Sequence, residues 1–110
     1  MATAPPPLVL VHGLWDTPQL FRRLVDSLDG RRDPLLMPHL AHRLGATPIL
    51  ELAEILGQAI EGAFGAEQPV DLLGFSMGGV IARSWIQLRG GASRTRRFIS
   101  VGSPQQGTLT

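Results

Sequence analysis

The sequence predicts an α/β domain in which a mostly parallel sheet of about four strands is layered with three helices. Short apolar runs alternate along the chain with longer segments in which apolar residues recur at helical spacing. The first run, Leu8–Val11, is continuously apolar, which is typical of a strand buried on both faces of a parallel sheet. Alternating strands and helices favour right-handed crossovers, which place helices on both faces in a three-layer αβα arrangement.

The first half of the chain is expected to contribute two strands and one helix. Leu8–Val11 is the first strand. A helix is predicted to begin at Thr17 and Pro18, because threonine is a good N-cap and proline suits the first helical position. Five apolar residues then follow at helical spacing: Leu20, Phe21, Leu24, Val25 and Leu28. Pro34–Met37 is a short candidate strand.

The second half is expected to contribute two helices and two strands. Thr47 and Pro48 repeat the cap-plus-proline start, and the apolar residues after them line one side of a helix: Ile49, Leu52, Ala53, Leu56, Ile60 and Ala63. Val70–Phe75 is predicted to be a strand, Met77–Leu88 a helix and Phe98–Val101 the last strand.

Composition narrows the classes of function. At 110 residues the chain is long enough for one domain. Its net charge of +1 gives no field that favours nucleic acid, and it has no cysteine for a disulfide or thiolate site. No segment has transmembrane length and no basic leader precedes the first apolar run, so a cytoplasmic location is the default expectation. No cluster of ligating residues or phosphate loop predicts a metal or a cofactor.

The most informative motif is Gly-x-Ser-x-Gly around Ser76. A predicted strand leads into it and a predicted helix follows at once, which is the context of a nucleophile elbow. Gly74 and Gly78 stand two residues before and two after the serine, where a strand and a helix nearly touch and a Cβ would obstruct them. The turn places Ser76 at a helix N-terminus, which favours developing negative charge. Ser76 is therefore the candidate catalytic nucleophile.

Three motifs in order resemble the α/β-hydrolase fold, and within it the lipase and esterase branch, the triacylglycerol-lipase-like proteins. They are the strand with His-Gly-Leu-Trp at 8–15, the serine motif at 74–79, and Val-Gly-Ser-Pro-Gln-Gln-Gly-Thr at 101–108. The resemblance covers nearly the whole chain. It implies a small-molecule ester or a lipid as substrate, hydrolysis through an acyl-enzyme, and no cofactor.

The resemblance also implies roles for single residues. Ser76 matches the nucleophile. The backbone N–H groups of Leu14 and Met77 match the two oxyanion-hole donors, which would stabilise a tetrahedral intermediate. His12 and Gly13 match the support of the oxyanion loop.

The chain departs from the family where the catalytic acid and base are concerned. In this family the triad runs serine, then Asp or Glu, then His, yet Asp71 is the last carboxylate and no histidine follows Ser76. Residues 1–110 therefore resemble a single N-terminal portion of a hydrolase domain. Three alternatives stay open. An unusual base such as His39 or His42, or another chain, completes an active esterase; a decayed half acts only as a scaffold or binding module; or the sequence is a fragment of a complete hydrolase.

Truncation would leave the last strand as an unprotected edge, so self-association through that edge is expected.

Overall fold

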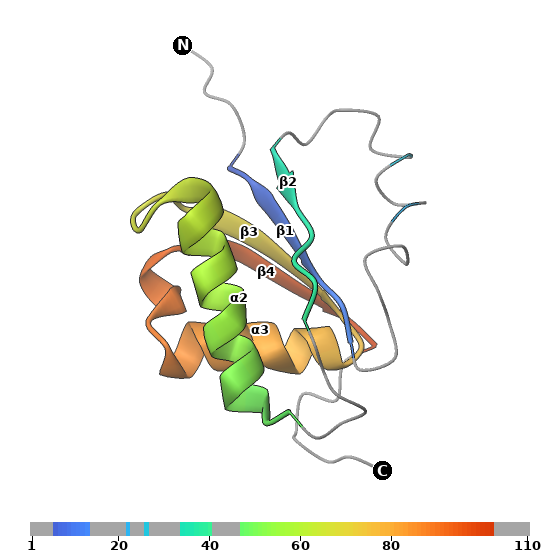
Figure 1. Cartoon of the computed structure of the whole chain (residues 1–110). Helices are drawn as coiled ribbons and strands as arrows, with labels where there is room; N and C mark the ends of the chain where they lie inside the picture. Colours follow the sequence, from blue (N-terminus) through green and yellow to red (C-terminus); the bar gives the residue numbers. More distant parts are fainter. Residues whose placement is uncertain (1–5, 14–21, 23–25, 27–33, 41–46, 103–110) are drawn as a thin grey trace.

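The computed structural model describes residues 6–13, 22, 26, 34–40 and 47–102, and these form an α/β unit on a four-stranded sheet (Figure 1). The strands are β1 (Leu8–Val11), β2 (Leu35–Leu36), β3 (Val70–Phe75) and β4 (Thr95–Val101), in the order β2-β1-β3-β4. All three pairings, β1 with β2, β1 with β3, and β3 with β4, are parallel. The predicted fold class and parallel sheet are confirmed.

Two of the three predicted helices lie in the described part of the chain. They are α2 (Ile49–Phe64) and α3 (Met77–Leu88), and a short 3-10 turn, η2 (Gly91–Ser93), follows α3. The helix predicted after Thr17 falls outside the described residues, except for Arg22 and Asp26.

Some boundaries differ from the sequence prediction for local reasons. The α2 helix begins one residue late: Pro48 has an extended backbone (ψ 148°), and its carbonyl accepts the first helical hydrogen bond from Leu52 N–H at 3.1 Å. Pro48 is therefore the N-cap, in place of Thr47, and no side chain caps the helix. The β4 strand begins at Thr95, earlier than predicted, because a β-bulge between Val70 and Asp71 lets the polar residues before Phe98 join the ladder.

The main core lies between the sheet and the two helices, which cover the same face of the sheet (Figure 1). Alternate residues of the central strands point into it: Val9, Val11, Val70 and Leu72. The helices contribute buried side chains, among them Leu52, Leu56, Ile60, Ile81 and Trp85. The buried residues of α2 all belong to the apolar set that the sequence placed on one side of this helix.

The opposite face of the sheet carries a smaller apolar cluster of Leu8, Leu10, Leu35 and Leu73. Ile99 pairs with Leu73, and Val101 pairs with Phe75, so these residues extend the same face toward β4. Phe75, Ile99 and Val101 are 37%, 58% and 43% exposed, and we call them the outer strip. Among the described residues no helix packs on the outer strip.

The strand order creates a switch point between β1 and β3. After β1 the chain moves to one side for β2, and it returns to the other side for β3. The carboxyl ends of β1 and β3 therefore lie side by side, with His12 following one and Ser76 the other. In open α/β sheets, ligands bind outside the carboxyl ends of the strands at such a point.

Two glycines allow α3 to pack against these strand ends. A Cβ on Gly74 would lie 2.5 Å from Gly79 Cα, so strand and helix backbones touch there. A Cβ on Gly78 would collide with the Val11 carbonyl and lie 2.8 Å from the His12 oxygen. Backbone atoms surround both positions, so neither can be relieved by turning a side chain.

A Gly78→Ala substitution should destabilise the protein by about 3 kcal/mol or more, or prevent folding, because the added methyl group overlaps the end of β1. Gly62→Ala is the matched control in α2, where a Cβ meets nothing within 4 Å. This control should gain about 0.5–1 kcal/mol, since alanine replaces glycine in an exposed helix interior. Urea denaturation of both variants measures the difference. Equal effects from the two substitutions would contradict the close packing of α3 against β1.

Candidate active site

Ser76 is the junction between β3 and α3. It is the N-cap of α3 and has φ 57° and ψ −129°. It is the only non-glycine residue with positive φ in the described part of the chain. A serine in this region is held there at a cost of about 1–3 kcal/mol, and such strain clusters at functional sites.

Backbone hydrogen bonds hold the bend at Ser76. Its N–H donates to the Val101 carbonyl at 2.8 Å, and its carbonyl accepts from Gly79 N–H at 3.0 Å. The serine is thus tied to the end of β4 and to the first turn of α3 at once. The side chain does not cap the helix, and the residue is half-buried.

Met77 is the first residue of α3. The first four N–H groups of a helix have no intrahelical acceptor, so the Met77 amide lies at the positive end of the helix dipole. The role of oxyanion donor for this amide stays a prediction from the sequence resemblance. The second predicted donor, Leu14, lies outside the described residues.

His12 is buried, at 1% exposure, directly after β1. Its Nε2 accepts the Leu40 N–H at 2.9 Å, which places the ring proton on Nδ1, 2.9 Å from the Gly13 carbonyl. The ring therefore ties the Gly13 turn to the segment after β2, 28 residues away in sequence. With Nε2 engaged by an amide, this histidine supports the loop and does not act as a base in this arrangement.

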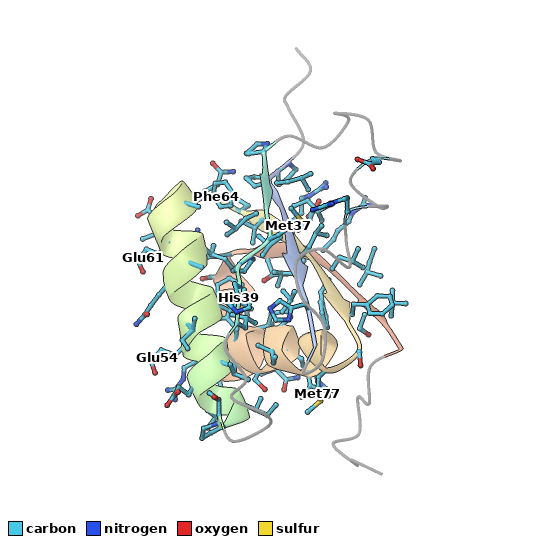
Figure 2. The ribbon with its side chains drawn as sticks, turned by 45° about the vertical axis from the view of Figure 1, so that its right-hand side comes forward. Met37, His39, Glu54, Glu61, Phe64 and Met77 are labelled. Atoms are coloured by element: carbon cyan, nitrogen blue, oxygen red, sulfur yellow. The ribbon has the colours of Figure 1, made fainter. Side chains whose placement is uncertain are left out.

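His39 stacks on His12, with ring centroids 5.6 Å apart and planes inclined by 28°. It is exposed at the end of the segment that follows β2, and Figure 2 shows it well separated from Met77 at the start of α3. His42, the other candidate base, lies outside the described residues.

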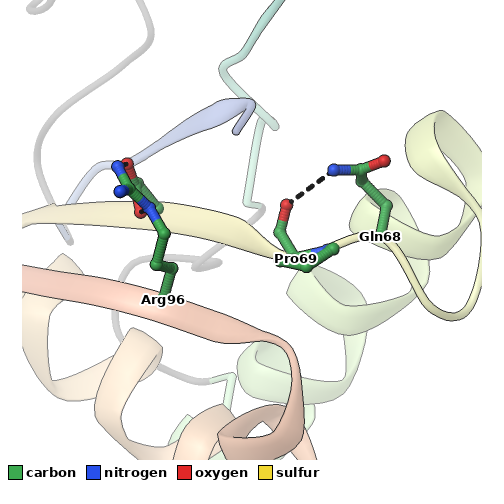
Figure 3. Close-up of polar contacts among 4 residues, drawn as sticks. Gln68, Pro69 and Arg96 are labelled. Atoms are coloured by element: carbon green, nitrogen blue, oxygen red, sulfur yellow. Dashed lines mark hydrogen bonds and ion pairs between the residues drawn. The ribbon is translucent and has the colours of Figure 1, made fainter. Parts of the chain in front are cut away.

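Asp71, the last carboxylate of the sequence, forms an ion pair with Arg96. It is buried, and Arg96 binds it with two bonds, Nε to Oδ1 at 3.0 Å and Nη2 to Oδ2 at 2.7 Å. The hydrogen bond to Asp71, reinforced by its charge and opposed by partial desolvation, raises the pKa of Arg96 above its ordinary value. Figure 3 shows the Arg96 side chain reaching from β4 toward β3.

The position of Asp71 also separates it from the candidate nucleophile. It is the second residue of β3, and Ser76 follows the strand's other end. Five residues of extended chain span roughly 16 Å. Asp71 is therefore a structural residue that closes the bulge with Arg96.

The structure brings Ser76, Met77, His12 and Gly13 to one edge of the sheet, and Gly74 and Gly78 make that approach possible. Sequence reasoning missed the Leu40 amide as the partner of His12 and Arg96 as the partner of Asp71. Both contacts join residues about 25 or more positions apart, so no local pattern reveals them.

The described residues contain no group of three or more His, Cys, Asp or Glu side chains suited to hold a metal ion. They also include no helix that combines the length and the apolar character needed to cross a bilayer.

Solved structures similar to this chain are hydrolases of low sequence identity. An extracellular α/β-hydrolase from a Paenibacillus species superposes with a TM-score of 0.72 at 19% identity, over 90% of this chain and 41% of that one. The lipase BlEst2 of Bacillus licheniformis gives a TM-score of 0.76 at 22% identity, over 96% and 44%. An esterase of a marine microorganism gives 0.65 at 20% identity, over 89% and 38%. The chain thus spans about two fifths of the length of these structures.

A search of curated protein sequences gave no match. The family model described as the alpha/beta hydrolase fold matches residues 6–109, which is nearly the whole chain. Together with the parallel sheet and its order, this match confirms the resemblance to the α/β-hydrolase fold: the chain belongs to the α/β-hydrolase fold family.

Proposed function

We propose that this chain carries the nucleophile half of a serine hydrolase that cleaves carboxylic esters of lipids or small molecules through an acyl-enzyme. Ser76 is the nucleophile in this proposal, and the Met77 and Leu14 amides hold the oxyanion. The observation that carries it is the backbone of Ser76, which is bent at φ 57° between β3 and α3. Similar structures named as a lipase and an esterase support ester chemistry.

This proposal requires a base that accepts the proton of the Ser76 hydroxyl. A serine hydroxyl needs a base to become a good nucleophile, and the sequence has no histidine after Ser76. His12 is engaged through both ring nitrogens, which leaves His39 and His42 as candidates within the chain. The alternative source is polypeptide beyond these residues, since the similar structures are more than twice as long. That residues 1–110 are the N-terminal portion of a larger domain stays a prediction.

A second candidate function is a catalytically incomplete scaffold or binding module. Residues 77–110 hold no aspartate, glutamate or histidine that could complete a triad with Ser76. It shares the fold and the strained serine with the first candidate, but it predicts no reaction at the hydroxyl.

A fluorophosphonate probe distinguishes the two functions. Positioning and oxyanion stabilisation alone retain about 10³–10⁴-fold catalysis over water in serine hydrolases that lack a triad member. We therefore expect slow addition of the phosphonate to Ser76, detected by intact-protein mass spectrometry, and none in the Ser76→Ala variant. His39→Ala and His42→Ala test the two candidate bases, since loss of labelling in either one identifies it.

The matched control is Ser84→Ala, a serine on α3 outside the motif, which should label like the parent. Folding of each sample is checked by circular dichroism. A folded parent protein that takes up no probe, or labelling that survives Ser76→Ala, would contradict the hydrolase proposal and favour the scaffold.

We also propose that the isolated chain self-associates through β4. This strand is at the edge of the described sheet, and the outer strip of Phe75, Ile99 and Val101 lies beside it. An exposed apolar edge strand is a template for pairing with another strand. A cytoplasmic location stays a prediction, and one of the similar proteins is described as extracellular.

Ile99→Lys should shift the isolated chain toward monomer, because a charge in the outer strip opposes burial of that face. Sedimentation velocity over a range of protein concentrations measures the effect. Leu50→Lys is the control, since Leu50 is 42% exposed on α2, away from the outer strip. A parent chain that stays monomeric at every concentration would refute this proposal.

A further inference from the structure

A cleft lies at the end of the molecule remote from Ser76. It has a volume of about 420 Å³ and opens between α2, the end of α3 and η2. Because α3 starts beside Ser76 and runs for 12 residues, its far end is roughly 18 Å from the candidate nucleophile. Side chains from α2 and from the region around the end of α3 line the cleft, among them Glu54, Gln58, Glu61, Trp85, Arg89 and Arg94. Its size is that of pockets that hold small molecules.

Trp85 supplies a buried donor in this cleft. The residue is only 4% exposed, and its indole N–H makes no hydrogen bond within the described part of the chain. Gly57 and Gly91 fix the ring in place: a Cβ on Gly57 would lie 2.7 Å from Nε1, and one on Gly91 would lie 2.6 Å from Cδ2. The indole ring is therefore packed closely between α2 and η2. A buried donor that lacks an acceptor is energetically unfavourable.

The charged groups of the cleft have opposite signs on opposite walls. Glu54 and Glu61 are one heptad apart on α2, and Figure 2 shows both projecting from the same side of the helix. Arg89 follows α3, and Arg94 follows η2. Within the described residues Glu54, Glu61 and Arg89 make no ion pair, so their charges are available to a ligand.

Arg94 has a different part in the cleft. Its Nε and Nη2 donate to the Gln68 carbonyl at 3.2 and 3.0 Å. The Gln68 side chain donates to the Pro69 carbonyl at 3.1 Å (Figure 3). These bonds hold the loop before β3 against η2. Arg94 thus shapes the wall, while Arg89 is the guanidinium that a ligand meets.

These groups define the chemistry of the ligand. A carboxylate pairs with the Arg89 guanidinium, beside Trp85 in the lining of the cleft. A protonated amine at the other end of the same molecule pairs with Glu54 and Glu61. We infer that this cleft is a second binding site, independent of the Ser76 chemistry, for a small zwitterion that carries a carboxylate and an ammonium group on a short chain.

Nuclear magnetic resonance tests the site through the indole signals. The chain has two tryptophans, so a Trp15→Phe variant leaves only the Trp85 Nε1–H cross-peak in a ¹⁵N spectrum. The probes are γ-aminobutyrate, which has both charges, butyrate, which has only the carboxylate, and butylamine, which has only the amine. We expect γ-aminobutyrate to shift the cross-peak saturably at neutral pH, with an affinity about tenfold or more above that of either single-charge probe.

Charge-neutral variants identify the groups involved. Arg89→Gln and Glu54→Gln should each weaken γ-aminobutyrate binding by about tenfold, since each removes one charge-assisted contact. Glu67→Gln and Arg97→Gln are controls, because these residues are exposed and do not line the cleft, and they should change the affinity by less than about twofold. The dispersion of the remaining amide signals verifies that every variant is folded.

Absence of a saturable Trp85 shift with γ-aminobutyrate would overturn the site. So would equal binding of butyrate, which indicates a simple anion contact, or control variants that weaken binding as much as Arg89→Gln.

Discussion

The close contact of backbones where β3 turns into α3 is the constraint on which the rest of the structure depends. Gly74 lies against Gly79, and Gly78 lies against the carbonyls at the end of β1. Only residues without a Cβ fit there. The start of α3 therefore packs directly against the sheet. A single residue, Ser76, connects β3 to α3, and it adopts a positive φ. The core beneath α3 and the position of the serine follow from the same contact.

This constraint also explains why the candidate site lies at the switch point of the sheet. The end of β1 accepts Gly78, so the turn after β1 and the start of α3 are neighbours. His12 fixes that turn to the segment after β2 by bonding the Leu40 amide. Ser76 is tied to β4 through the Val101 carbonyl. Three separate segments therefore meet at one edge, as expected for a site whose backbone donors must be pre-positioned.

Much of the fold could be predicted from local patterns, and the long-range contacts could not. The spacing of apolar residues located α2 and α3, and Gly-x-Ser-x-Gly located the bend, because both signals are contained in short stretches. The early start of β4 depends on a bulge paired with β3 and on Arg96 meeting Asp71, which lie far apart in sequence. The Trp85 cleft could not be predicted for the same reason, because its opposite walls, α2 and η2, are distant in sequence.

The stability of two variants at position 76 tests the central claim most directly. Ser76→Gly and Ser76→Ala both remove the hydroxyl, so their difference in free energy of unfolding reports the backbone alone. At φ 57° glycine is relaxed and alanine is strained. The account predicts that Ser76→Gly is more stable than Ser76→Ala by about 1–2 kcal/mol. If Ser76→Gly is instead less stable by about 0.5–1 kcal/mol, as at an ordinary position, the strained bend is contradicted.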